Sequence, residues 1–141
     1  PDGDLLGLGL SSIGSMGASY VQNAKTLDEY SDLLNQGKLP VVKGITLTRD
    51  DLARRSVIMA LMCQGRVEWT SIEESHLLTF KSYFASEIQQ LQGFVQQELV
   101  TIDDHAITVT ERGWYVVRAI AMVFDKYVQA DEQRTHFSKI L

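Results

Sequence analysis

The residues with the clearest potential for binding chemistry form a glycine- and serine-rich run near the start of the chain, Gly7-Leu8-Gly9-Leu10-Ser11-Ser12-Ile13-Gly14. Residues 4–10 are short and apolar, which predicts a strand buried on both faces, as in a parallel sheet. Glycines at such a strand end let backbone approach a ligand, and α/β folds bind ligands at the carboxyl ends of strands. The spacing fits neither Gly-x-Gly-x-x-Gly nor the P-loop. A ligand-lining loop and a close-packed strand therefore remain equally good interpretations.

Metal binding and nucleophilic catalysis have little support in the sequence. His76, His105 and His136 are far apart, and a single cysteine cannot form a thiolate metal site. That cysteine, Cys63, lies among apolar neighbours of an expected helix, which favours a buried structural thiol over a catalytic one. The sequence also lacks a Gly-x-Ser-x-Gly nucleophile elbow.

Arginines are the remaining polar candidates. Arg54 and Arg55 are adjacent on an expected helix, and such side chains are more often solvated or ion-paired than functional. Guanidinium groups do suit carboxylates, which they bind in a bidentate manner. Nucleic-acid binding is disfavoured, because Asp103 and Asp104 at the expected hairpin tip would repel phosphate.

Bulk composition is that of a globular protein with enough apolar material for a core. The 141 residues are 45% hydrophobic and 22% charged, and the formal net charge is −5. Acidity argues against nucleic-acid or anionic-membrane partners, and no apolar run approaches the length of a membrane span. A single cysteine suits a reducing cytoplasm, which is the expected location.

The first third of the chain reads as part of an α/β domain followed by a linker. The strand over 4–10 is expected to lead into a loop over 11–25, and Thr26 is expected to cap a short helix. Residues 36–47 are expected to be a linker. A lone parallel strand here has nothing upstream to pair with, so we expect a C-terminal part of a larger protein, cut inside an α/β domain.

Periodicity predicts a mainly helical second unit over 48–141. A capping box at Thr48-Arg49-Asp50-Asp51 begins a helix that Gly65 ends. A short strand at 67–69, a helix over 74–97, a β-hairpin over 100–110 and an apolar helix over 114–124 follow. This order is typical of a winged-helix-type module. The expected fold class is therefore mainly α with a small β-hairpin (α+β), divided into 1–25, 26–47 and 48–141.

Taken in order, these segments resemble the oxygen-independent coproporphyrinogen III oxidases, a family of radical S-adenosylmethionine enzymes of haem biosynthesis. The resemblance is carried by 4–13, Ser19-Tyr20-Val21-Gln22-Asn23, 44–51, Arg54-Arg55, Tyr83-Phe84, the hairpin from Leu99 to Thr110 with Gly113, Phe124-Asp125-x-Tyr127 and Phe137-Ser138-Lys139-Ile140. No single piece is a strong motif, but the ordered set is specific and covers essentially the whole chain.

The resemblance implies a function that composition does not show. Family members bind S-adenosylmethionine and a [4Fe–4S] cluster, and they oxidatively decarboxylate two propionates of coproporphyrinogen III, giving protoporphyrinogen IX. It makes this chain the last strand and loop of a truncated (β/α) barrel, followed by a winged-helix-like domain that caps the barrel. The cluster-binding cysteines and most of the barrel are absent, so the isolated fragment is expected to be inactive and to bind no cofactor.

The resemblance also implies site residues. The isoleucine that ends the family's Gly-x-Gly-x-Ser-x-Ile run contacts S-adenosylmethionine, and it corresponds to Ile13, with Gly9 and Ser11 leaving room beside it. Ser12 replaces an expected alanine. The candidate propionate contacts are Arg49, Arg54 and Arg55.

Other interpretations stay open. Related radical S-adenosylmethionine haem chaperones or methyltransferases share the barrel end, and a non-catalytic winged-helix binding module is a further alternative. The expected partner is coproporphyrinogen III, bound through the missing barrel, with neither nucleic acid nor membrane. The chain is expected to be a monomer, or a dimer formed through an exposed N-terminal segment.

Overall fold

The computed structural model of the chain describes residues 3–128. Two compact units share the chain, one ending at Asp50 and one starting at Asp51, and we call them the N-terminal and C-terminal units. Both helices and strands contribute to the fold, so the chain is a mixed α/β protein. The Phe137-Ser138-Lys139-Ile140 segment of the resemblance lies outside the described residues.

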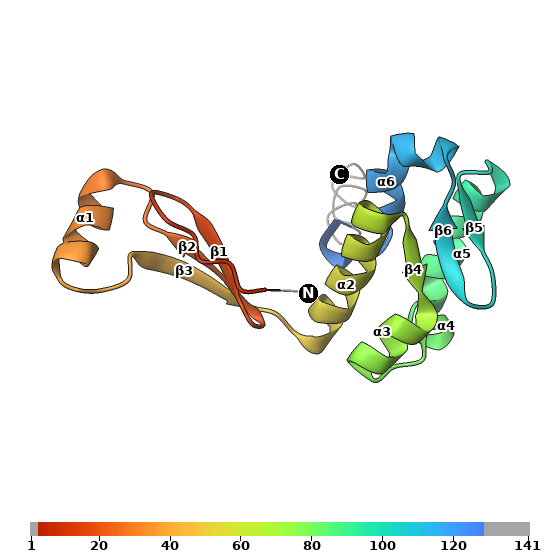
Figure 1. Cartoon of the computed structure of the whole chain (residues 1–141), viewed down its shortest axis with the longest axis horizontal. Coiled ribbons are helices and arrows are strands. Elements are labelled where there is room, and N and C mark those ends of the chain that lie inside the picture. Colours follow the sequence, from red (N-terminus) through yellow and green to blue (C-terminus); the bar gives the residue numbers. More distant parts are fainter. Residues whose placement is uncertain (1–2, 129–141) are drawn as a thin grey trace, which may run out of the picture. The chain divides into compact units, whose positions relative to one another are not determined.

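The N-terminal unit is a three-stranded antiparallel sheet with one helix. Strand β1 (Ile13–Met16) forms a hairpin with β2 (Ser19–Asn23), and helix α1 (Leu27–Asn35) connects β2 to β3 (Val41–Thr46). The strand order is β1-β2-β3, and the three strands lie side by side in Figure 1. Small residues at the turn allow the reversal, and the β-branched and apolar residues that follow favour extended backbone.

Three expectations for this unit are wrong. Residues 11–25 are not a loop but contain the β1–β2 hairpin, and the expected linker over 36–47 contains β3. The strand expected over 4–10 does not form, since only Leu5 makes a bridge, to Ser15. The described chain offers that run no parallel neighbour, and its leucines are therefore exposed, as at Leu8 with 83% of its surface accessible.

The expected helix after Thr26 is confirmed as α1. The Thr26 carbonyl accepts a hydrogen bond from the Tyr30 N–H at 3.1 Å, but the Thr26 side chain makes no capping bond. Tyr30 and Leu33 are half-buried, and no residue of α1 is fully buried. This helix therefore contributes little to a core.

The C-terminal unit contains the remaining elements except the first two residues of α2, and Figure 1 shows them in chain order. They are α2 (Arg49–Gln64), β4 (Arg66–Glu68), α3 (Trp69–His76), α4 (Phe80–Tyr83), α5 (Ala85–Gln96), β5 (Val100–Ile102), β6 (Ala106–Val109), the 3₁₀ helix η1 (Arg112–Val116) and α6 (Val117–Met122). A second antiparallel sheet has the strand order β4-β6-β5. The predicted first helix, short strand and hairpin are confirmed.

One aromatic core stabilises the C-terminal unit. The Phe84 ring lies 4.9 Å from the Phe80 ring and 5.4 Å from the Phe124 ring, measured between centroids. Leu61 of α2 and Leu91 of α5 are also fully buried in this cluster. Because α2, α4, α5 and the segment after α6 each supply a buried side chain, the core links elements that are far apart in sequence.

Two details of the C-terminal unit differ from expectation. The helix expected over 74–97 is three helices, because Leu77 adopts a left-handed conformation (φ 53°) after α3 and residues 77–79 separate α3 from α4. Cys63 is exposed rather than buried, since the face of α2 that enters the core carries Ala53, Val57 and Leu61 at a spacing of four.

The expected helix over 114–124 begins and ends differently. It starts as η1 at Arg112, α6 ends at Met122, and Tyr115 is 92% exposed. Ile120 and Ala121 are fully buried, so only one face of this segment enters the core. The predicted cap is confirmed, because Thr110 Oγ1 accepts the Gly113 N–H at 3.1 Å.

No helix within residues 3–128 is both long enough and apolar enough to cross a bilayer.

Candidate functional site

The glycine- and serine-rich run forms a loop that is fastened to the end of β2. The Asn23 side-chain amide donates to the Gly7 carbonyl at 3.1 Å, the Gly9 carbonyl at 3.0 Å and the Ser12 hydroxyl at 3.0 Å. The backbone N–H of Asn23 also donates to the Ser12 carbonyl at 3.0 Å. Residues 7–12, which we call the glycine loop, thus make polar contacts with Asn23 at Gly7, Gly9 and Ser12.

Two kinds of glycine occur in and beside the glycine loop. A Cβ on Gly14 would lie 2.7 Å from the Leu5 carbonyl oxygen, so this position needs glycine for close packing. Gly9 has φ +94° and open space where a Cβ would lie, so its conformation rather than its packing favours glycine. The close-packing interpretation therefore applies to Gly14. Gly9 has open space beside its backbone, as a ligand-lining loop would require.

Ile13 begins β1 on an open face of the sheet. It pairs with Gln22, and the period-two alternation of strands puts Tyr20, Lys43 and Ile45 on the same face. These side chains line a shallow hollow of about 130 Å³, together with backbone near Val21 and Gly44. Ile13 is 58% exposed. The hollow therefore offers an apolar floor with an amide and a cation at its edge.

The structure gives Arg54 an internal role. Its Nη1 donates to Glu87 Oε1 at 2.8 Å and to the Phe124 carbonyl at 3.1 Å, and its guanidinium carbon lies 5.6 Å from the Phe84 ring centroid. The two charged side chains are 16% and 6% exposed, so the pair is mostly withdrawn from water. Arg54 therefore joins α2, α5 and the segment after α6.

The other two candidate arginines lie near the start of α2. Arg49 is exposed at its first residue, and Arg55 is half-buried beside Arg54. Nearby, the buried Asp51 carboxylate accepts from Lys126 Nζ at 2.6 Å and from the Tyr127 hydroxyl at 3.2 Å. The helix start is thereby attached to Lys126 and Tyr127, within the Phe124-Asp125-x-Tyr127 segment that the sequence analysis named only as part of the resemblance.

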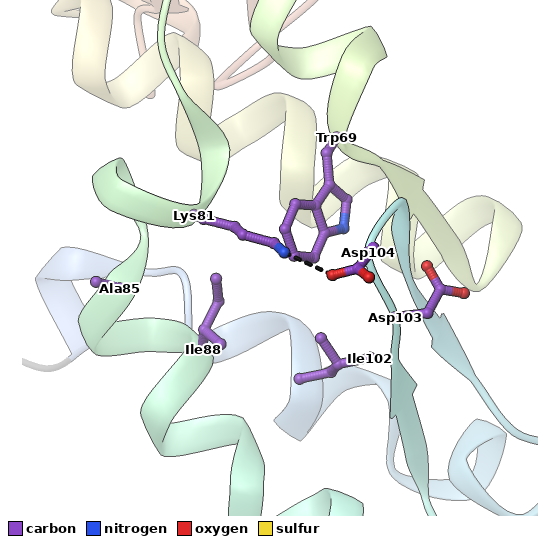
Figure 2. Close-up of a pocket in the computed structure, with 7 residues that line it drawn as sticks. All are labelled: Trp69, Lys81, Ala85, Ile88, Ile102, Asp103 and Asp104. Atoms are coloured by element: carbon purple, nitrogen blue, oxygen red, sulfur yellow. Dashed lines mark hydrogen bonds and ion pairs between the residues drawn. The ribbon is translucent and has the colours of Figure 1, made fainter.

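A separate pocket of about 560 Å³ lies between α3–α5 and the β5–β6 hairpin. Figure 2 shows Lys81 reaching from α4 toward Asp104, with Ile88 and Ile102 below, whereas the Asp103 carboxylate points away. Lys81 Nζ lies 2.8 Å from Asp104 Oδ1 and 4.7 Å from the Trp69 ring centroid. Sequence reasoning missed this pocket, because the pocket forms only where α3, α4 and α5 pack beside the hairpin, and one long helix was expected in their place.

Both aspartates of the hairpin tip have lowered pKa values. Backbone N–H groups of His105 and Ala106 donate to Asp103 and lower its pKa below the usual 3.8. The Lys81 hydrogen bond and charge lower the pKa of Asp104 below the same value. Both groups are therefore ionised at neutral pH, which keeps the hairpin tip acidic.

The chain does not fit a [4Fe–4S] cluster held by three thiolates, because it has one cysteine and that residue is exposed. Within residues 3–128 no three histidine, cysteine, aspartate or glutamate side chains are grouped as metal ligands would be.

Comparison with known proteins relates the middle of this chain to one family. Residues 47–116 match the HemN C-terminal domain. The particular relatives are oxygen-independent coproporphyrinogen III oxidases. The Salmonella typhimurium protein is 39% identical over 140 residues and the Escherichia coli K12 protein 37% identical over 140 residues, each alignment covering 99% of this chain and 31% of the relative.

A solved structure agrees with these sequence matches. Coproporphyrinogen III oxidase (HemN) from Escherichia coli, described as a radical SAM enzyme, superimposes with a TM-score of 0.83 and 40% sequence identity. The match covers 88% of this chain and 29% of that structure. The chain therefore spans about a third of the length of the relatives it matches, and the resemblance stated from its residues is confirmed.

Proposed function

We propose that this chain is the C-terminal portion of an oxygen-independent coproporphyrinogen III oxidase, which converts coproporphyrinogen III to protoporphyrinogen IX. The observation that carries the proposal is the similarity of 99% of the chain to one continuous third of enzymes with that name. When bound in the complete protein, S-adenosylmethionine and the cluster supply the radical chemistry. The residues present here bind and orient, and the isolated chain is inactive.

Ile13, Gly9 and Ser11 form the cofactor contact of this proposal. The hollow beside Ile13 supports it, because aliphatic side chains suit the face of an adenine and the polar side chain of Gln22 lines the same hollow. Lys43 adds a cation to the same hollow, which suits the cofactor's carboxylate. The open volume at Gly9 lets backbone approach the ligand closely.

Arg49 and Arg55 are the propionate contacts of this proposal. Arg54 was a third candidate, but its guanidinium already pairs with Glu87 and Phe124, so we assign it the structural task of holding its neighbours in place. The proposed substrate carries several carboxylates. Carboxylates are ligands that guanidinium groups bind well, because the two groups form paired hydrogen bonds.

In this proposal the C-terminal unit is a winged-helix-like cap and the N-terminal unit is the end of the catalytic barrel. The strand order β4-β6-β5, with helices between β4 and the hairpin, supports the winged-helix description. Exposed apolar side chains of the N-terminal unit support contact with the rest of a longer protein. They include Leu5, Leu6, Leu8, Leu10, Ile13, Met16, Val42 and Ile45 around the sheet, and Leu27, Leu34, Leu39 and Val41 in and beside α1. Such a cap excludes water from reactive intermediates.

The same proposal places the enzyme in the cytoplasm without a nucleic-acid or membrane partner. The ionised Asp103 and Asp104 at the hairpin tip support this, since they would repel nucleic-acid phosphate and anionic lipid headgroups.

The test is anaerobic turnover by the complete protein that carries this region, comparing Ile13→Asn with the matched control Leu39→Asn. Leu39 is 68% exposed and lies outside the hollow. Loss of about 1.5 kcal/mol of apolar contact predicts a roughly tenfold higher KM for S-adenosylmethionine in Ile13→Asn and an unchanged value in the control. Haem binding or methyl transfer without decarboxylation would instead assign the chain to the related chaperones or methyltransferases.

A further inference from the structure

Asn23 has no role in the function described so far, yet its side chain is buried and contacts three acceptors. It is the last residue of β2 and is 6% exposed. Its carboxamide nitrogen lies within 3.1 Å of three acceptors, the Gly7 carbonyl, the Gly9 carbonyl and the Ser12 hydroxyl. Burying an amide costs little free energy when its hydrogen bonds are made. Removing the amide would leave its buried acceptors without a donor, which is destabilising.

We propose that Asn23 is the positioning residue of the cofactor contact: its carboxamide fixes the glycine loop and thereby sets where Ile13 and Ser11 meet the ligand. This inference rests on the proposed function for the identity of that ligand. The residue touches no ligand itself and acts through residues 7–12.

The donors and acceptors around Asn23 explain why this side chain fixes the position of the loop. The Ser12 hydroxyl donates its single hydrogen to the Gly9 carbonyl at 2.9 Å, so its lone pairs are free to accept from Asn23. The carboxamide has two hydrogens for three acceptors and therefore shares them. Asn23, Ser12 and Gly9 form a closed polar ring, and each member orients the next.

The glycine loop is not fixed by buried apolar side chains in place of these hydrogen bonds. Leu8 at its centre is exposed, and the Gly9 N–H reaches only the Tyr30 hydroxyl, at 3.2 Å. A loop without buried side chains takes its position from its hydrogen bonds. Because Ile13 directly follows Ser12, a shift of the polar ring moves the start of β1.

Gln22 supports the same loop from the neighbouring position of β2. Its Nε2 donates to the Ser11 carbonyl at 3.2 Å, and the Ser11 N–H donates to the Ala24 carbonyl at 2.8 Å. Ser11 has a left-handed backbone (φ 54°), which a serine adopts only when its surroundings require it. The pair Gln22-Asn23 thus holds both faces of the loop, with Asn23 the buried and stronger member.

The test compares Asn23→Asp with the matched control Asn35→Asp. The first substitution keeps the shape of the side chain, removes both hydrogens and directs a carboxylate at two carbonyl oxygens. The second makes the same chemical change in the same unit at an exposed residue. Amide hydrogen exchange at Ser11 and Asn23 of the complete protein reports loop position, and KM for S-adenosylmethionine reports cofactor contact.

The proposal predicts at least tenfold faster exchange and about tenfold to hundredfold higher KM for S-adenosylmethionine in Asn23→Asp, with KM for the porphyrinogen unchanged. Unchanged exchange overturns the positioning role. Faster exchange with an unchanged KM for S-adenosylmethionine overturns the link to the cofactor, while wild-type turnover in the same assay still supports the proposed function. A wild-type protein with no affinity for S-adenosylmethionine overturns the proposed function by itself.

A milder variant guards against a folding defect. Ser12→Ala removes one member of the polar ring but leaves the carboxamide bonds to the Gly7 and Gly9 carbonyls. We expect an intermediate rise in KM for S-adenosylmethionine, about threefold, and an effect in the double variant smaller than the product of the two single effects. If the effects of the two single substitutions on KM for S-adenosylmethionine multiply in the double variant, Asn23 and Ser12 act independently, which would contradict the closed ring.

Discussion

The two units of this chain are held together in opposite ways. The C-terminal unit buries four aromatic side chains and an Arg54–Glu87 pair in one core, whereas the N-terminal unit buries almost no large side chain and relies on strand pairing and the Asn23 contacts. Most of its leucines and both of its isoleucines are exposed. The difference teaches that the C-terminal unit has a hydrophobic core of its own, whereas the exposed apolar surface of the N-terminal unit is what the proposed contact with the rest of a longer protein predicts.

The largest contrast is expected from the same substitution in each unit. Leu61→Ala removes a fully buried side chain from the core, and we expect the free energy of unfolding to fall by about 2–5 kcal/mol. Leu8→Ala changes an exposed side chain, so the expected change is below about 0.5 kcal/mol. Urea denaturation of the chain measures both, and equal effects would remove the basis of the comparison.

The next effect concerns backbone packing in the C-terminal unit. A Cβ on Gly113 would lie 2.0 Å from the Leu99 carbonyl oxygen, so Gly113→Ala must displace backbone and should cost about 3 kcal/mol. Gly93 lies in α5 with nothing within 4 Å of such a Cβ. Gly93→Ala is therefore expected to stabilise the helix by up to about 1 kcal/mol. Thermal denaturation should shift in opposite directions for the two variants.

A smaller loss is expected from the buried ion pair. Glu87→Gln leaves the Arg54 guanidinium with a neutral partner in a mostly buried place, which should cost about 2 kcal/mol. The matched change, Glu98→Gln, touches an exposed pair with Arg112 at 3.4 Å and should have no measurable effect. A double-mutant cycle with Arg54→Met measures the interaction free energy between Arg54 and Glu87. A value near zero would show that the two side chains contribute packing but no charge interaction.

The smallest effect is a pH dependence at the hairpin tip. Because folding lowers the pKa of Asp103 and Asp104 below 3.8, their stabilising contribution is complete above that pH and is lost as the pH falls through the lowered values. Carboxyl NMR titration should show the Asp104 pKa returning toward 3.8 in Lys81→Met, with Asp103 less affected. An unchanged Asp104 titration would exclude the Lys81 contact in solution.

Sequence reasoning succeeded where local chemistry decides the structure. The start of α2 directly after Thr48, the period-two alternation of the hairpin and the Thr110 cap depend on residues near one another in the chain, and each is confirmed. It failed over 4–10 and 11–25, because an apolar run becomes a buried strand only when neighbours pair with it. Periodicity likewise could not show that Leu77 breaks the expected helix.

The sequence by itself determined the resemblance to the relatives, the first helix and the hairpin of the C-terminal unit, because these depend on residue types and their spacing along the chain. Only the tertiary structure decided that Asn23 fastens the glycine loop, that Arg54 is engaged by Glu87 and Phe124, and that Lys81 spans a pocket to Asp104. Each of these contacts joins residues between 11 and 70 positions apart. Such pairings depend on how the chain packs in three dimensions, which local propensity and periodicity do not specify.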